Sequence, residues 1–257
     1  MFMVELTFRG DLTGFLPREL RKAASVRREL SERTAAKDVI EACGVPHSEV
    51  DLIVVRTPDS DPRAVDFSWV VQAPVCLEVH PVPAPADVLP AAPRLQLHAW
   101  DRFVADGHLG KLARNLRLLG LDTAYERDAD DRRLLEIMTA ENRALLTRDR
   151  RLLMHSVVRQ GYCPRSSDAV EQTRGTLRRF ALLHDSGRLA PFGRCLRCNG
   201  FLEPIARAEI LQTLAAEPLT LRYYDEFRRC SDCRRIYWPG THFQKLAARV
   251  ANLLDES

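Results

Sequence analysis

Residues 102–120 read RFVADGHLGKLARNLRLLG, and this stretch decides the fold of the second half of the chain. Its first residues form a short apolar run that ends in an acid, Asp106, which is typical of a buried strand. A helix is predicted over residues 108–119, because apolar side chains recur on one helical face and Gly120 follows. Those apolar positions are Leu109, Leu112, Ala113, Leu116 and Leu119. A strand that passes directly into a helix indicates an α/β domain.

The same alternation continues further along the chain. Strands are predicted at residues 122–125 and 144–147, with a helix at residues 131–142 between them. Alternating strands and helices imply a mostly parallel sheet that helices cover on both faces. In such a sheet, ligands bind beyond the carboxyl ends of the strands.

Three aspartates lie where a ligand would bind. Asp106 and Asp149 directly follow apolar strands, and Asp131 begins the helix that lies between them in sequence. Carboxylates that converge on one edge repel each other, and a divalent cation relieves that repulsion. Oxygen ligands suit Mg²⁺ or Mn²⁺, which activate water against a phosphodiester. We therefore predict these three aspartates as catalytic metal ligands. Further acids that can contribute are Asp128, Asp130 and Glu141.

A structural interpretation of the same aspartates stays open. Asp131 and Asp149 each stand at the start of a predicted helix, where an aspartate can act as an N-cap without binding metal. This interpretation does not readily account for Asp106, which ends a strand before Gly107. Basic residues beside the acids can hold RNA phosphates, although on a helix they also form an ordinary solvated face. The predicted RNA-binding residues are Lys111, Arg114, Arg148 and Arg150.

A proline-rich stretch at residues 80–93, HPVPAPADVLPAAP, separates this α/β part from what precedes it. Prolines fix φ and remove backbone donors, which favours a stiff linker with few contacts across it. A proline-rich surface loop inside one domain is the alternative. Residues 1–95 hold 11 Lys+Arg against 14 Asp+Glu, a net charge of −3, whereas residues 96–257 hold the remaining 27 and 21, a net charge of +6. The asymmetry permits a nucleic-acid partner for the second part.

Short strands surround one helix before the linker. The helix is predicted at residues 34–44, with Thr34 as its N-cap and Gly44 as the left-handed residue that ends it. The predicted strands are residues 4–9, a segment near 16–28, and residues 50–56, 65–71 and 75–79. The order β-β-α-β-β-β is that of a β-grasp, ubiquitin-like domain.

Four of the seven cysteines form two CxxC pairs, Cys195 with Cys198 and Cys230 with Cys233, with 31 residues between the pairs. Four thiolates satisfy tetrahedral Zn²⁺ and leave no open position, which predicts a structural zinc site. Four free thiols or a redox pair are the alternatives, but a redox pair would precede a helix in a βαβ unit.

The remaining cysteines and the N-terminus bear on the compartment. Cys43, Cys76 and Cys163 are predicted to be buried small apolar residues. Paired cysteines that bind metal favour a reducing compartment. The first residues, MFMVELTFRG, hold an early acid and no signal-peptide pattern, and no apolar run is long enough to cross a membrane. We therefore predict a cytoplasmic protein with no membrane partner.

Four runs of sequence carry a resemblance to a known family. They are residues 103–120 (FVADGHLGKLARNLRLLG), 145–150 (LLTRDR), 194–199 (RCLRCN) and 230–242 (CSDCRRIYWPGTH). Together they resemble the Mut-seven C-terminal RNase family, a PIN-like nuclease fold with an appended zinc ribbon, over roughly residues 100–245. The first 83 residues resemble the ubiquitin-like domain that precedes this nuclease in many bacterial members.

This resemblance implies an α/β fold class with an N-terminal β-grasp (ubiquitin-like) domain, a PIN-like domain with a parallel sheet and a C-terminal zinc ribbon. The implied domains are a ubiquitin-like domain at 1–83, a linker at 84–99, a nuclease at 100–190, a zinc ribbon at 191–245 and a C-terminal helix or tail at 246–257. The resemblance implies a metal-dependent ribonuclease whose partner is RNA, with Asp106, Asp131 and Asp149 as its acidic site. Asn115 stands where many members have an aromatic residue, which bears on helix packing rather than on the metal.

Two other functions stay open. A non-catalytic RNA-binding module would use the zinc ribbon and the basic helix at 108–119, although retention of all three acids argues against it. A sulfur carrier or ubiquitin-like modifier needs a free C-terminal Gly-Gly, whereas residues 79–83 run on into the linker. A toxin would be a variant of the nuclease, but such proteins are typically short single domains. We also expect that the N-terminal domain can bind a protein partner through its sheet.

Overall fold

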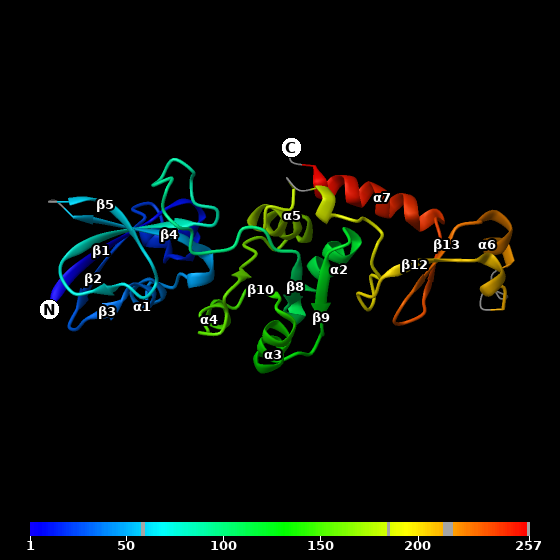
Figure 1. Cartoon of the computed structure of the whole chain (residues 1–257), viewed down its shortest axis with the longest axis horizontal. Coiled ribbons are helices and arrows are strands. Elements are labelled where there is room, and N and C mark those ends of the chain that lie inside the picture. Colours follow the sequence, from blue (N-terminus) through cyan, green and yellow to red (C-terminus); the bar gives the residue numbers. More distant parts are fainter. Residues whose placement is uncertain (58–59, 184–185, 213–217, 256–257) are drawn as a thin grey trace. The chain divides into compact units, whose positions relative to one another are not determined.

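The computed structural model describes residues 1–57, 60–183, 186–212 and 218–255. These residues form two compact units, each built from two stretches of the chain. The first unit comprises Met1–Trp100 with Asp131–Cys163, and the second comprises Asp101–Asp130 with Pro164–Ser257. Figure 1 shows the helices and strands of both. Neither unit therefore coincides with one continuous segment of the chain.

The first unit begins with five main strands and one helix. Its N-terminal elements are β1 (Phe2–Phe8), β2 (Ser25–Leu30), β3 (Thr34–Ala35), α1 (Ala36–Glu41), β4 (Val50–Thr57), β5 (Ser60–Val65), β6 (Val70–Val71) and β7 (Val75–Pro81). The sheet has the order β2-β1-β7-β4-β5; β1 and β7 are parallel, and the other neighbours are antiparallel. The first and last strands of this domain, β1 and β7, therefore pair in parallel inside the sheet, which confirms the predicted β-grasp, ubiquitin-like fold.

Two local predictions for this domain differ from the structure. Thr34 does not cap α1, because it pairs with Val71 in the β3–β6 ladder, and the helix begins after Ala35. The predicted strand at 65–71 is interrupted by a turn, in which the Asp66 carboxylate accepts hydrogen bonds from the backbone N–H groups that follow it. Gly44 does adopt a left-handed conformation, with φ +86°.

The proline-rich segment packs on the first domain rather than running free. The Asp51 side chain is fully buried, and its carboxylate accepts hydrogen bonds from Ala84 N at 2.9 Å and Gln96 N at 3.3 Å. The same carboxylate contacts His98 at 2.9 Å. Because a buried carboxylate needs hydrogen-bond donors, these contacts hold the segment against β4. The sequence predicted few contacts here, since composition does not show which buried acid requires them.

The second stretch of the first unit carries α3 (Asp131–Glu141), β10 (Ala144–Leu146), α4 (Arg150–Leu153) and β11 (Gly161–Tyr162). β10 and β11 are parallel. Side chains of the ubiquitin-like domain bind this stretch directly: His47 Nε2 lies 2.7 Å from the Val158 carbonyl, and Glu49 accepts a hydrogen bond of 2.6 Å from Cys163 N. The first unit is therefore a joint packing of the two stretches.

The second unit contains another parallel pair, a group of helices and a three-stranded ribbon. Its elements are β8 (Arg102–Ala105), α2 (Gly110–Leu118), β9 (Asp122–Tyr125), α5 (Ala169–Arg179), β12 (Leu202–Ile205), α6 (Pro218–Tyr223), β13 (Phe227–Cys230), β14 (Ile236–Tyr237) and α7 (Thr241–Leu254). β8 and β9 are parallel, and β12, β13 and β14 form an antiparallel sheet. These strands confirm the predicted α/β class with a parallel sheet.

The Asn115 side chain on α2 joins this helix to α5 and α7. Its side chain is 2% exposed and donates hydrogen bonds to Ala169 O at 3.1 Å and Thr173 Oγ1 at 2.9 Å, both on α5. Its carbonyl oxygen accepts from Arg249 Nε on α7 at 2.8 Å. α7 begins at Thr241, earlier than the tail expected from residue 246, and residues 256–257 lie outside the described part of the chain.

The three cysteines outside the CxxC pairs differ in burial. Cys163 is buried, Cys43 is half-buried and Cys76 is exposed, so the prediction of burial is wrong for Cys76. The reason is the two-residue period of β7, which places Leu77 in the core and turns Cys76 outward. Within the described ranges, no helix combines the length and the apolar character needed to cross a bilayer.

Candidate functional site

Asp106 stands at the end of β8, as the sequence predicts. The residue is half-buried, with an extended backbone, and its carboxylate lies 3.1 Å from His108 Nδ1. A carboxylate at the carboxyl end of a parallel strand occupies the edge where α/β sheets bind ligands.

Two glycines shape the backbone around this acid. A Cβ on Gly107 would lie 2.2 Å from the Arg127 carbonyl oxygen, so the turn after β8 approaches the loop after β9 too closely for any side chain. A Cβ on Gly110 would meet the Tyr125 hydroxyl at 2.6 Å, and that hydroxyl donates a hydrogen bond of 2.8 Å to Gly107 O. The Asp-Gly-His-Leu-Gly run is therefore dictated by close packing against β9.

Asp149 and Asp131 both lie in the first unit. Asp149 is the N-cap of α4, where its Oδ1 accepts from Arg151 N at 2.7 Å and Leu152 N at 3.2 Å. Capping leaves lone pairs on the carboxylate, so it does not exclude a metal. Asp131 is exposed and borders a hollow of about 850 Å³, whose rim includes Arg151 and His155. Asp106 belongs to the second unit, so the convergence of the three acids stays a prediction.

The additional acids occupy different places. Asp128 and Asp130 are exposed in the loop between β9 and α3. Glu141 ends α3, and its carboxylate lies 2.6 Å from an Arg143 guanidinium nitrogen. Ten residues of helix separate it from Asp131, about 15 Å at 1.5 Å per residue. We therefore leave Glu141 out of the proposed acidic site.

The predicted RNA-binding residues also differ in availability. Lys111 and Arg114 are exposed on α2, and Arg148 is exposed before α4. Arg150 donates a hydrogen bond of 2.7 Å to Phe15 O, and its guanidinium lies 5.0 Å from the centre of the Phe15 ring. Arg150 therefore joins α4 to the ubiquitin-like domain, a role that only the fold reveals.

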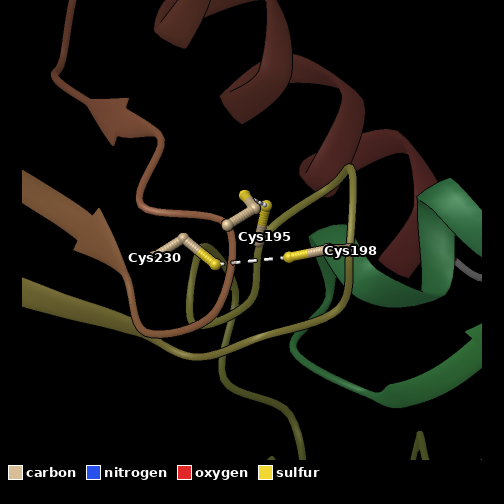
Figure 2. A group of neighbouring side chains, drawn as sticks. Cys195, Cys198 and Cys230 are labelled. Carbon is tan, nitrogen blue, oxygen red and sulfur yellow. Dashed lines mark hydrogen bonds between the residues drawn. The ribbon is translucent and has the colours of Figure 1, made fainter.

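The structure brings all four CxxC cysteines together. Their sulfurs lie within 4.8 Å of one another, with Cys195 and Cys233 at 3.6 Å and Cys198 and Cys230 at 3.3 Å. Figure 2 shows Cys195 and Cys198 on one loop and Cys230 at the end of a strand, with their sulfurs turned inward. A tetrahedral ion with Zn–S bonds of 2.3 Å holds sulfurs about 3.8 Å apart. The arrangement can bind a metal such as zinc.

Hydrogen bonding prepares this cluster for a cation. The Tyr237 hydroxyl lies 3.0 Å from Cys195 Sγ. Burial raises the pKa of the Cys195 thiol, but donors from Tyr237, Cys198 and Arg197 outweigh it and lower that pKa to about 6. Burial, together with the hydrogen bonds to the neighbouring thiols, raises the pKa of Cys230 to about 12. Without a cation the group therefore favours one thiolate, whereas metal binding removes protons from all four thiols.

The first cysteine loop is attached to the α/β core. The buried Arg117 side chain on α2 donates hydrogen bonds to Arg197 O at 2.9 Å and to Thr123 O at 2.9 Å. The Asn199 side chain accepts from Thr123 N at 3.0 Å and donates to Asp122 Oδ1 at 2.7 Å. Sequence reasoning missed Arg117 and Tyr237. Asn199-Gly after CxxC is a turn signal, but Arg117 among leucines resembles any helical arginine.

Comparison with known proteins agrees with this architecture. The Mut7-C RNAse domain matches residues 101–250, and the Mut7-C ubiquitin domain matches residues 1–87. Searches of curated proteins and of solved structures returned no significant match. The first match covers more than half of the chain and includes Asp106, Asp149 and both cysteine pairs. The chain belongs to the Mut7-C RNAse domain family and carries that family's ubiquitin domain at its N-terminus.

Proposed function

We propose that this protein is a metal-dependent ribonuclease that cleaves RNA phosphodiester bonds. The observation that carries the proposal is the RNAse-domain match over residues 101–250, together with Asp106 at the end of a parallel strand. In the proposed site, Asp106, Asp131 and Asp149 would together hold Mg²⁺ or Mn²⁺. Asp128 and Asp130 lie near enough in sequence to Asp131 to assist.

The proposed mechanism assigns ion binding to the aspartates and phosphate binding to basic residues of α2. The bound ion would supply a Lewis acid and an activated water for attack on phosphorus. Asp106 is oriented by the tight turn at Gly107, and Asp149 by its bonds to the first turn of α4. Preorganised carboxylates hold the ion without movement, which is how such sites lower the barrier. Lys111 and Arg114 would hold RNA phosphates.

The four-cysteine group has a separate role in this proposal. We assign it structural Zn²⁺, because four protein ligands close the coordination shell and leave no position for water. Arg117 and Asn199 join the first cysteine loop to β9, the neighbour of the strand that carries Asp106. Zinc would therefore stabilise the edge of the proposed nuclease site. Reduced zinc thiolates also fit the proposed cytoplasmic location.

The ubiquitin-like domain holds part of the proposed nuclease in place. Its contacts from His47, Glu49 and Phe15 reach the stretch that contains Asp131 and Asp149. A protein partner could still bind this domain, but the proline-rich segment already packs on Leu52 and Val54 of β4. Such a partner would therefore bind away from these residues of β4.

A non-catalytic RNA-binding module is the second candidate, and the capping role of Asp149 favours it. Asparagine caps a helix as well as aspartate does, so Asp149→Asn separates the two roles. If Asp149 binds metal, the variant should lose cleavage by about 100-fold or more, since metal stabilises the transition state by several kcal/mol. If Asp149 only caps, activity should stay near wild type.

The assay is incubation of purified protein with total cellular RNA, with Mg²⁺, with Mn²⁺ and with neither, followed by sequencing of the RNA ends. Asp106→Asn is measured in parallel, and Glu141→Gln serves as the matched acidic control outside the proposed site. Metal-dependent ends that disappear in both aspartate variants support the nuclease. Activity that survives in both variants contradicts it.

A further inference from the structure

The second unit contains a groove that the proposed catalytic site does not use. We call it the ribbon groove: its volume is about 1190 Å³, and its lining comes from α2, the cysteine loops and the start of α7. The basic residues that line it are Arg114, Arg194, Arg197, Arg228, Arg234 and Arg235. Glu226 is the one acid among the described lining residues. The groove therefore has a strongly positive lining.

Most of this charge is available to a ligand. Arg194 is committed to the fold, because its guanidinium lies 3.5 Å from Asp122 and 4.3 Å from the centre of the Phe201 ring. In contrast, four of the lining arginines are exposed and form neither an ion pair nor a side-chain hydrogen bond within the part of the chain that the structure describes. These four are Arg114, Arg197, Arg234 and Arg235. Unpaired guanidinium groups at several points along a groove suit a ligand with repeated negative charge, such as a phosphate backbone.

Aromatic side chains lie among the arginines. Phe192 and Phe243 stack with ring centres 4.6 Å apart, and Phe243 is 37% exposed. Trp238 and Tyr237 line the same groove. Basic grooves with exposed aromatic faces are typical of single-strand binding, since unpaired bases can stack whereas a duplex hides its base faces. An acidic protein surface would pair with the arginines but would supply no bases to stack on these rings.

The groove also connects to the proposed catalytic edge. Arg114 lines it from α2, and Lys111 lies one turn closer to the start of that helix. Asp106 precedes Arg114 by eight residues, and α2 begins at Gly110, so Arg114 lies about 6 Å along the helix axis from the start of α2. Residues three apart share a helical face, so Lys111 and Arg114 continue the positive surface toward Asp106. We propose that the ribbon groove binds single-stranded RNA and guides the strand along α2 to Asp106. This inference rests on the proposed nuclease function.

The test measures binding without cleavage. The probe is a fluorescein-labelled 2′-O-methyl oligonucleotide of about 12 nucleotides, which spans a typical single-strand site. Fluorescence anisotropy gives its affinity for the full-length, zinc-loaded protein at several salt concentrations. The test variant is Arg197→Gln with Arg235→Gln, which keeps the side-chain stems. The matched control is Arg178→Gln with Arg222→Gln, which removes two exposed arginines outside the groove.

The expected result has two parts. Each phosphate contact contributes a salt slope of about 0.7 on a single strand, hence a factor of about 5 at 0.1 M salt. The test variant should therefore bind about 25-fold more weakly, with a slope smaller by about 1.4, while the control stays within about twofold of wild type. Phe243→Ala should weaken binding at least about fivefold through lost stacking, with an unchanged salt slope. The complementary duplex probe should bind more weakly than the single strand.

Other results overturn the proposal. Equal affinities for the test and control variants would exclude RNA from the groove and leave a protein partner as its occupant. If the arginine variant loses zinc, Phe243→Ala decides alone, because its side chain lies outside the cysteine loops. Cleavage is scored separately with unmodified RNA. If the groove variants bind the probe more weakly but wild type does not cleave RNA, the nuclease proposal fails and the groove proposal stands. If wild type cleaves RNA and the groove variants bind the probe as tightly as wild type, only the groove proposal fails.

Discussion

His47 offers a direct test of whether the ubiquitin-like domain is part of the nuclease. Its side chain is 9% exposed and lies at the contact between the two stretches of the first unit. Nδ1 lies 2.6 Å from Glu41 Oε1, and Nε2 lies 2.7 Å from Val158 O. The carboxylate and the carbonyl oxygen can each accept a hydrogen bond from a ring N–H. The ring also packs edge-on against Phe67, with centres 5.8 Å apart.

The size of the effect follows from these contacts. A hydrogen bond to a charged group contributes about 1.5–3 kcal/mol, and a neutral one about 1 kcal/mol. An edge-to-face ring contact adds about 1 kcal/mol. His47→Ala should therefore destabilise the first unit by about 4 kcal/mol, which corresponds to a shift of about 1.3–2 M in the urea midpoint for an m-value of about 2–3 kcal/mol/M. An effect of this size is large for one residue, because the substitution removes both ring contacts from a position where the side chain is only 9% exposed.

Urea unfolding followed by circular dichroism and by tryptophan fluorescence measures the loss. His155→Ala is the matched control, since this exposed histidine of the same unit should cost less than about 0.5 kcal/mol. Below the transition, His47→Ala should also reduce metal-dependent cleavage, because Asp131 and Asp149 lie on the stretch that His47 holds. A loss of stability below about 1 kcal/mol would refute the reasoning. Recovery of a soluble, active protein after deletion of residues 1–90 would refute it as well.

Three further perturbations test other parts of the structure. Cys198→Ser should lower zinc content measured by elemental analysis together with the thermal midpoint, because structural zinc contributes on the order of 10 kcal/mol in small zinc-folded units; zinc-free wild-type protein would contradict the site. Gly107→Ala should reduce cleavage more than it reduces helix content, since its Cβ would lie 2.2 Å from Arg127 O and displace the turn that carries Asp106; normal turnover would show that the turn adapts. The Glu78 carboxylate pairs with Arg9 and Arg56, each at 2.6 Å. Burial raises the pKa of Glu78, but the hydrogen bonds from the two arginines outweigh burial and hold that pKa below its usual 4.5. A carboxylate with a lowered pKa stabilises the fold above pH 4.5, and this contribution is lost as the pH falls below 4.5. The urea midpoints of wild type and Glu78→Gln should therefore converge in acid. A difference in midpoint that stays constant with pH would contradict this assignment.

The sequence alone determined those features that depend on neighbours along the chain. The strand and helix at 102–120 follow from local periodicity, and β9 matches residues 122–125 as predicted. The clustering of the four cysteines was predictable from the spacing of the two CxxC pairs, since four thiolates suit one tetrahedral metal ion. The left-handed glycine at Gly44 closes a local helix. Each of these features is short-range, so the residues that cause it lie within a few positions of one another.

Only the tertiary structure decided which distant segments meet. A proline-rich composition does not reveal that buried Asp51 requires backbone donors from the segment that follows β7. A helical arginine beside Asp149 does not reveal that Arg150 donates a hydrogen bond to Phe15 O, 135 residues earlier in the chain. Asp149 itself caps a helix, and its local pattern fits capping and metal binding equally. These contacts join polar groups from stretches that lie far apart in the sequence. Buried polar groups need such partners, but the periodicity of one stretch does not indicate which distant group will supply them.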